Sequence, residues 1–178
     1  MNLVRYSFLN KVYQRIDDPR HGDCFKCAIC TLLGLDYDDV PNYVDCGDDW
    51  YIEAQKTFKE HGYNLTGMEL WNPKVMYLEN PTVNIFEDKE AHVPSTFIAL
   101  KREMGINGLF LASVYSPKYT NADEHPIDHL HSVLCDFDFN IVFDPQPEYA
   151  KVVNYPYSKL IGYNGIRSID IIKPIIKA

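Results

Sequence analysis

The spacing of apolar residues predicts two helices in the first half of the chain. Residues 24–33 form an apolar run of helix length, and residues 48–61 carry apolar side chains four positions apart. Each segment is followed by a glycine, Gly34 or Gly62, and glycine commonly ends a helix because it tolerates the left-handed conformation. We expect Asp48 to be the N-cap of the second helix. Its apolar positions are Trp50, Ala54 and Phe58.

Other parts of the first half give weaker patterns. Residues 3–16 alternate in part between apolar and polar side chains, which is consistent with a strand or an extended lead-in. Prolines interrupt residues 63–87, so no element is predicted there, and residues 95–104 have the spacing of a third helix. Polar turns are expected at residues 17–22 and 36–43.

The second half is dominated by short runs rich in β-branched and aromatic residues. We predict strands at 108–115, 130–137, 140–143 and 166–172, with a polar loop at 116–128. Helices followed by strands indicate an α+β fold with an antiparallel sheet. We expect a single domain over residues 1–178, whose helical half (about 22–104) packs on its sheet half (about 108–174).

Composition narrows the class of partner. The chain has 178 residues and a net charge of −8 with no basic run, so we expect neither nucleic acid nor an anionic membrane as a partner. The N-terminus lacks the apolar region of a signal peptide, and no run approaches the ~18 apolar residues of a membrane span. Five cysteines, three of them in one predicted helix, do not form a disulfide framework. We therefore expect a cytoplasmic protein with reduced thiols.

Cys24 is the strongest candidate for a reactive group. It follows a turn pair, Gly22-Asp23, and is expected in the first turn of a helix. There, unpaired backbone N–H groups and the positive end of the helix dipole favour a thiolate over a thiol.

A base and an orienting carboxylate are expected in the sheet. If residues 130–143 form a hairpin that turns at 138–139, positions 131–134 lie opposite 143–146, and His131 lies diagonally beside Asp144 on one face. A cysteine nucleophile needs a base such as His131 and an acceptor such as Asp144 that orients this base. His129, two residues earlier, is an alternative base. His125 and Asp128 are assigned to a solvated loop.

A metal site is the competing interpretation of the three clustered cysteines. Cys24, Cys27 and Cys30, with Cys46 or Cys135 as a fourth ligand, would supply enough thiolates for zinc or an iron–sulfur cluster. Helix geometry argues against this site, because thiols three residues apart fan over ~120° of a helix face. Cys27 and Cys30 are therefore predicted to be core residues, and no metal or cofactor is expected.

Several short motifs resemble the papain-like cysteine peptidases. They are Gly22-Asp23-Cys24-Phe25, Leu32-Leu33-Gly34-Leu35, Val40-Pro41, His131-Ser132-Val133-Leu134 and Asp144-Pro145. The chain is most similar to the bacteriocin-processing (double-glycine) peptidase branch and to small uncharacterised bacterial and phage proteins related to it. The resemblance implies a papain-like fold, a Cys24–His131–Asp144 triad, and cleavage or transfer at a peptide, amide or related acyl bond.

The chain departs from this family at the residue that helps to bind the oxyanion. The family usually has a glutamine a few residues before the cysteine, but here the position six residues before Cys24 is Asp18. Gln14 is the nearest glutamine and fills the role if residues 17–22 are an insertion. Loss of this donor would favour a second hypothesis, a catalytically silent papain-like domain that binds a protein or a small ligand. Metal binding remains the third hypothesis.

Overall fold

The computed structural model describes residues 9–18, 21–69, 105–115, 130–136, 141–146 and 166–176. Two α-helices come first in the chain. The first strand, β1 (Tyr63–Glu69), directly follows the second helix. Two short 3-10 helices, η1 (Tyr37–Asp39) and η2 (Tyr43–Asp49), connect α1 (Cys24–Leu33) to α2 (Trp50–Glu60). The later strands are β2 (Leu109–Tyr115), β3 (Leu130–Asp136), β4 (Ile141–Phe143) and β5 (Ile166–Pro174).

These five strands form one antiparallel sheet in the order β1-β5-β2-β3-β4. The α+β class and the four strands predicted in the second half are therefore confirmed, with ends that differ by two residues at most. The structure corrects the division into halves, because β1 belongs to the predicted helical half but lies at one edge of the sheet.

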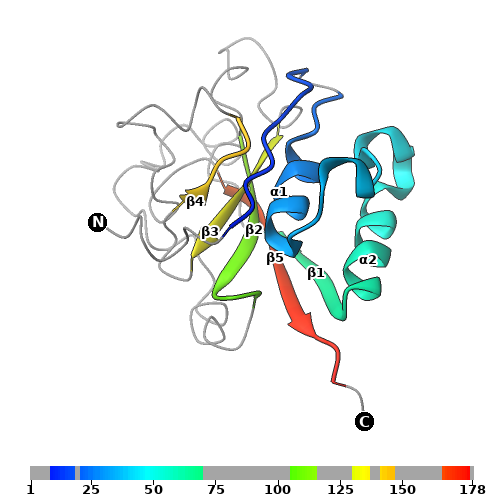
Figure 1. The fold of residues 1–178 in the computed structure, drawn as a ribbon, viewed down its shortest axis with the longest axis vertical. Coiled ribbons are helices and arrows are strands. Elements are labelled where there is room, and N and C mark those ends of the chain that lie inside the picture. Colours follow the sequence, from blue (N-terminus) through cyan, green and yellow to red (C-terminus); the bar gives the residue numbers. More distant parts are fainter. Residues whose placement is uncertain are drawn as a thin grey trace, which may run out of the picture.

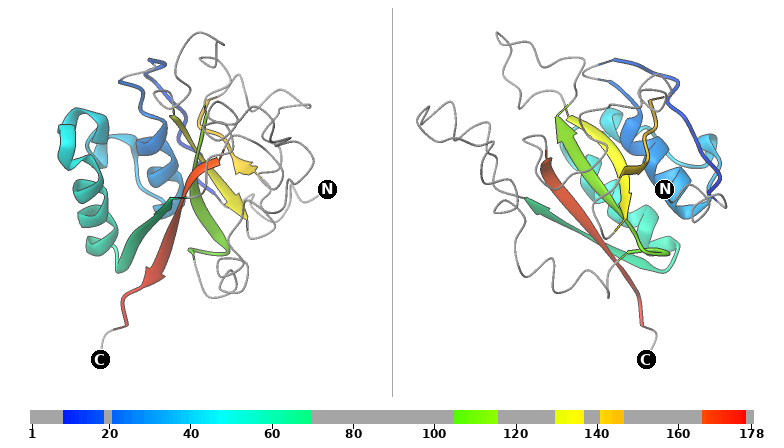
Figure 2. Two further views of the ribbon diagram at one scale, coloured as in Figure 1. Left: turned by 180° about the vertical axis from the view of Figure 1, so that it is seen from behind. Right: turned by 90° about the vertical axis from the view of Figure 1, so that its left-hand side faces the viewer.

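Both helices pack on the same face of the sheet (Figures 1 and 2). α1 contacts β3 and β2, while α2 contacts β1. Their apolar faces meet a continuous core that includes Ile29, Phe58, Leu111, Leu134 and Ile172. Side chains on the opposite face of β2, β3 and β5 are buried as well. They include Phe110, Ala112, Val133, Cys135 and Ile169.

The ends of the two helices show which local signals were reliable. Gly34 follows α1 with φ of 72°, and the backbone N–H of Leu35 donates to the carbonyl oxygen of Cys30 at 2.9 Å, which confirms the predicted stop. The predicted start of the second helix is wrong: Asp48 lies in η2, and α2 begins at Trp50 without a side-chain cap. The aromatic ring of Trp50 packs edge-on against Phe25 of α1 instead.

Strand β1 was not predicted from its sequence. It contains Gly67, opposite Asp170 of β5. The Tyr51 hydroxyl of α2 donates to the buried Asp170 carboxylate at 2.8 Å, and a Cβ at Gly67 would lie 2.9 Å from that hydroxyl. Glycine therefore leaves room for the close approach of the Tyr51 hydroxyl to this strand.

Residues 9–18 are an extended lead-in with no regular strand. The possible third helix at 95–104, the loop at 116–128, and His125, Asp128 and His129 lie outside the described residues. In the part of the chain that the structure describes, neither helix has the length and apolar character needed to cross a membrane.

Candidate active site

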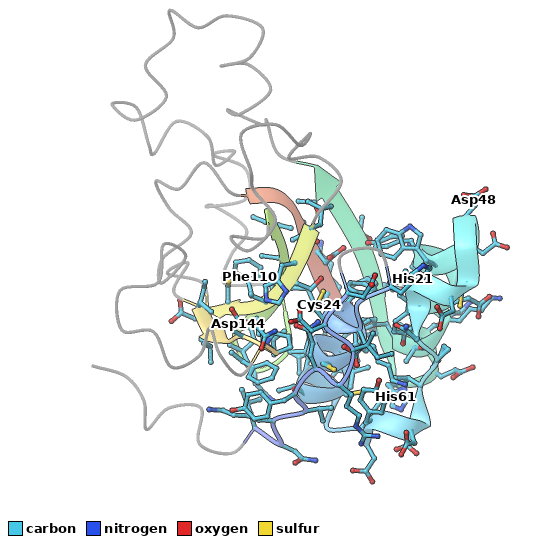
Figure 3. All side chains as sticks on the ribbon, turned by 90° about the horizontal axis from the view of Figure 1, so that it is seen from above. His21, Cys24, Asp48, His61, Phe110 and Asp144 are labelled. Atoms are coloured by element: carbon cyan, nitrogen blue, oxygen red, sulfur yellow. The ribbon has the colours of Figure 1, made fainter. Side chains whose placement is uncertain are left out.

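Cys24 is the first residue of α1, as predicted, and its side chain is half-buried. The backbone turns into the helix here, and the first helical hydrogen bond runs from the N–H of Cys27 to the carbonyl oxygen of Asp23 at 2.9 Å. The N–H groups of the first turn have no partner within the helix, so they add positive potential around the sulfur. Figure 3 shows Cys24 at this end of α1, close to β3.

His131 and Asp144 form a buried pair at the junction of β3 and β4. The hairpin pairs Leu134 with Phe143, which is the register predicted from the sequence, but the register shifts at the next pair, Cys135 with Ile141. It brings His131 Nε2 to 2.7 Å from Asp144 Oδ1, with both side chains buried. The same oxygen accepts the backbone N–H of Gln146 at 2.8 Å. The carboxylate is therefore held in place and can orient the imidazole.

The structure brings Cys24 into hydrogen-bond contact with His131. Burial alone would lower the pKa of His131, but hydrogen bonds to Asp144 and Cys24 and the negative charge on both raise this pKa to about 10. Burial likewise favours the neutral thiol of Cys24, yet the hydrogen bond and positive charge of His131 lower its pKa. Each shift favours the charged form of its group, so the site favours a thiolate paired with an imidazolium. Since Nε2 is bonded to Asp144, Nδ1 is the nitrogen available to the sulfur.

Ser132 is a site residue that the sequence reasoning missed. Its backbone N–H and its hydroxyl both hydrogen-bond Cys24 and lower the pKa of the thiol. Among the described residues, β4 pairs with β3 only at Leu134 and Cys135, which leaves the Ser132 N–H unclaimed by that strand. A serine directly after the histidine was visible in the sequence, but no spacing rule marks it as a partner of the cysteine.

The remaining thiols differ sharply from Cys24. Cys27, Cys30 and Cys135 are fully buried, and burial raises the pKa of each, to about 11 for Cys30. The core assignment of Cys27 and Cys30 is confirmed by this burial. Cys46 is half-buried in η2. Within the described ranges, no group of three or more His, Cys, Asp or Glu side chains is arranged to hold a metal ion.

The two oxyanion candidates lie close to the turn before Cys24. Gln14 Nε2 donates to the carbonyl oxygen of Ile16 at 3.2 Å and lies 3.6 Å from where a Cβ at Gly22 would be. The exposed carboxylate of Asp18 accepts the backbone N–H of His21 at 2.8 Å. An ionised carboxylate has no proton to donate, so of the two residues only Gln14 has the polarity that an oxyanion requires.

Other described histidines do not share this site. His21 is exposed beside the turn, and His61 follows α2, where its Nδ1 contacts the carbonyl oxygen of Thr57 at 2.8 Å. In Figure 3, His21 and Asp144 lie to opposite sides of Cys24, and His61 lies away from it. His131 is thus the described histidine that contacts Cys24.

The arrangement provides a charged nucleophile, a proton donor and a carboxylate that orients the donor. Such a set can form and break an acyl bond to sulfur. Comparison of the chain with protein-family models, with curated proteins and with solved structures found no match.

Proposed function

We propose that this protein is a cysteine-dependent hydrolase or acyl transferase with a papain-like fold, acting on a peptide or other amide bond. The observation that carries the proposal is the hydrogen-bonded series Cys24–His131–Asp144, drawn from α1, β3 and the residue after β4. A buried imidazolium beside a half-buried thiolate is costly to maintain, and such perturbed groups cluster at functional sites.

The reaction follows from the charges of the resting site. The Cys24 thiolate attacks the carbonyl carbon, a C–S bond forms, and the carbonyl oxygen becomes an oxyanion. His131 then gives its proton to the leaving nitrogen as the C–N bond breaks. Water or another nucleophile next loses a proton to His131 and attacks the acyl group, which releases the thiolate. Asp144 holds the imidazole in one orientation throughout, and the backbone N–H of Cys24 supplies one oxyanion donor.

The alternative is a papain-like domain that binds a protein or a small ligand without catalysis. The contact between His131 and Cys24 argues for catalysis, because a binding surface does not require an ionised thiol. The substrate class we propose is a peptide or another amide-containing molecule, with no cofactor.

The test combines an alkylating reagent with an acylating one. Wild type should react with iodoacetamide at near-neutral pH faster at Cys24 than at Cys46, as measured by peptide mass spectrometry. It should also release a stoichiometric burst of 4-nitrophenolate from 4-nitrophenyl acetate as the acyl group moves to sulfur. Cys24→Ala should abolish the fast labelling and the burst of 4-nitrophenolate. Cys46→Ala, the matched control, should retain the fast labelling and the burst. Fast labelling of Cys24 without a burst would instead favour the binding domain.

A further inference from the structure

A strap of extended chain, residues 12–16, joins α1 to the loop that follows β4. The N–H of Val12 donates to Thr31 Oγ1 in the last turns of α1 at 2.9 Å. The N–H of Gln14 donates to the carbonyl oxygen of Pro145, also at 2.9 Å. In Figure 1 the strap is the dark blue trace that crosses beside α1. It therefore passes directly between the two segments that carry the nucleophile and the carboxylate.

The Asp23 side chain binds the C-terminal end of this strap. Its carboxylate is fully buried and accepts the N–H of Arg15 at 3.0 Å and the N–H of Ile16 at 3.2 Å, one on each oxygen. The Tyr37 hydroxyl donates to the same carboxylate at 2.6 Å. Three donors compensate for the burial of the charge. Asp23 does not cap α1 with its side chain, so its hydrogen bonds are directed to the strap and to η1.

Gln14 comes directly before the two residues that Asp23 binds. Its amide nitrogen uses one hydrogen in the bond to the carbonyl oxygen of Ile16 and lies beside Gly22, two residues before the nucleophile. The second hydrogen on this nitrogen can be donated to a substrate. The position of the amide depends on the path of the strap, because the side chain bonds to the strap's own backbone.

We propose that Asp23 is a positioning residue: it fixes the strap so that the Gln14 amide can donate a hydrogen bond to the oxyanion formed at Cys24. The inference rests on the proposed function. It adds a role for a buried carboxylate that never touches the substrate and acts only through Gln14.

Two electrophiles separate this role from a merely structural one. With 4-nitrophenyl acetate, the thiolate adds to a carbonyl carbon, the oxygen becomes an oxyanion, and 4-nitrophenolate leaves. With iodoacetamide, a C–S bond forms at a tetrahedral carbon as iodide leaves, and no oxyanion appears. Both reactions need the Cys24 thiolate, but only the first needs an oxyanion donor.

The variants are Asp23→Asn, Gln14→Ala and the control Asp38→Asn. An asparagine at position 23 places an N–H against one of the two backbone N–H groups that the carboxylate accepts. Asp38 is exposed and pairs with the Arg15 guanidinium at 3.5 Å, so its replacement removes a nearby charge without touching the strap backbone. Circular dichroism and thermal unfolding report whether each variant folds.

Asp23→Asn and Gln14→Ala should each slow acylation by about 100-fold or more and leave the alkylation rate of Cys24 within about 3-fold of wild type. Asp38→Asn should leave both rates unchanged. Equal loss of both rates in folded Asp23→Asn would assign Asp23 a structural role, and no loss would remove its role altogether; either result overturns the inference.

If Asp23→Asn does not fold, Tyr37→Phe decides the question, because it removes one of the hydrogen bonds that hold the Asp23 carboxylate in place and so loosens the strap without changing a residue of the strap. It should slow acylation more than alkylation, and the lack of such a difference overturns the inference. Failure of the proposed function is a distinct result: wild type itself would then show no burst and no preferential alkylation of Cys24.

Discussion

Replacing His131 by alanine should raise the pKa of the half-buried Cys24 and so favour its neutral thiol over the thiolate. In the wild type, burial favours the neutral thiol, and the contacts with His131 and Ser132 are what lower its pKa. Without the imidazole, the remaining burial opposes ionisation. We therefore expect the pKa of Cys24 in His131→Ala to lie at or above that of a free cysteine.

The expected size of the effect follows from the ionised fraction. A cysteine with a pKa of about 8.5 is only about 1% thiolate at pH 6.5, so a fully ionised Cys24 offers up to about 100-fold more thiolate. Part of this gain is lost because a less basic thiolate is a weaker nucleophile, with a Brønsted coefficient of about 0.4–0.5. The shape of the pH profile is therefore a sharper measure than the rate at a single pH.

The assay is the rate of iodoacetamide labelling of Cys24 between about pH 6 and about pH 8, with Cys46→Ala as the background for both proteins. The wild-type rate should rise less steeply with pH than the His131→Ala rate, because the imidazolium lowers the pKa of Cys24 and the raised pKa of His131, about 10, keeps the imidazole charged over this range. The rate for His131→Ala should rise about tenfold per pH unit. A wild-type profile with that same slope would refute the ion-pair assignment, since it would show an ordinary thiol at position 24.

Two further variants test the electrostatics of the fold and of the site. Asp170→Asn keeps an acceptor for the Tyr51 hydroxyl but cannot ionise. Burial raises the pKa of Asp170 from 3.8 to about 6, so its ionisation should cost the wild type on the order of 3 kcal/mol of folding free energy as the pH rises through this interval. Urea unfolding at pH 4 and pH 7 should show that the variant lacks this loss, and an identical pH dependence in both proteins would contradict it. Ser132→Ala removes a hydroxyl that bonds Cys24 but keeps the backbone N–H, so it should slow alkylation at pH 6.5 by less than His131→Ala does. Labelling at the wild-type rate would contradict a role for the hydroxyl.

Sequence patterns predicted best the structural features that depend on residues close together in the chain. The apolar run before Gly34 defines α1, and alternation in two adjacent strands, joined by a short turn, predicts the pairing of Leu134 with Phe143. That register is enough to place His131 beside Asp144. Cys24 was predicted correctly at a helix start because the turn and the apolar run are local signals.

Features that depend on distant partners could not be predicted. The N-cap prediction at Asp48 failed because Trp50 packs on Phe25, and tertiary packing there sets the helix start. Strand β1 was not predicted because residues 63–87 were treated as one segment interrupted by prolines, although the prolines, at 73 and 81, follow the strand and its partner is the distant β5. The hydrogen bonds of Asp23 to the strap likewise have no signature in the sequence.

The place of β5 in the sheet has a consequence for how the protein is made. β5 is the last strand in the chain, yet it lies between β1 and β2 and pairs with both. During synthesis the segment with Cys24 emerges early, but β1 lacks the strand with which it pairs in the described part of the chain, and the Tyr51 hydroxyl lacks its acceptor, until residues 166–174 have been added. The sheet that presents His131 to the cysteine is completed only then. A ribosome-bound fragment that lacks β5 therefore carries Cys24 without the complete five-stranded sheet.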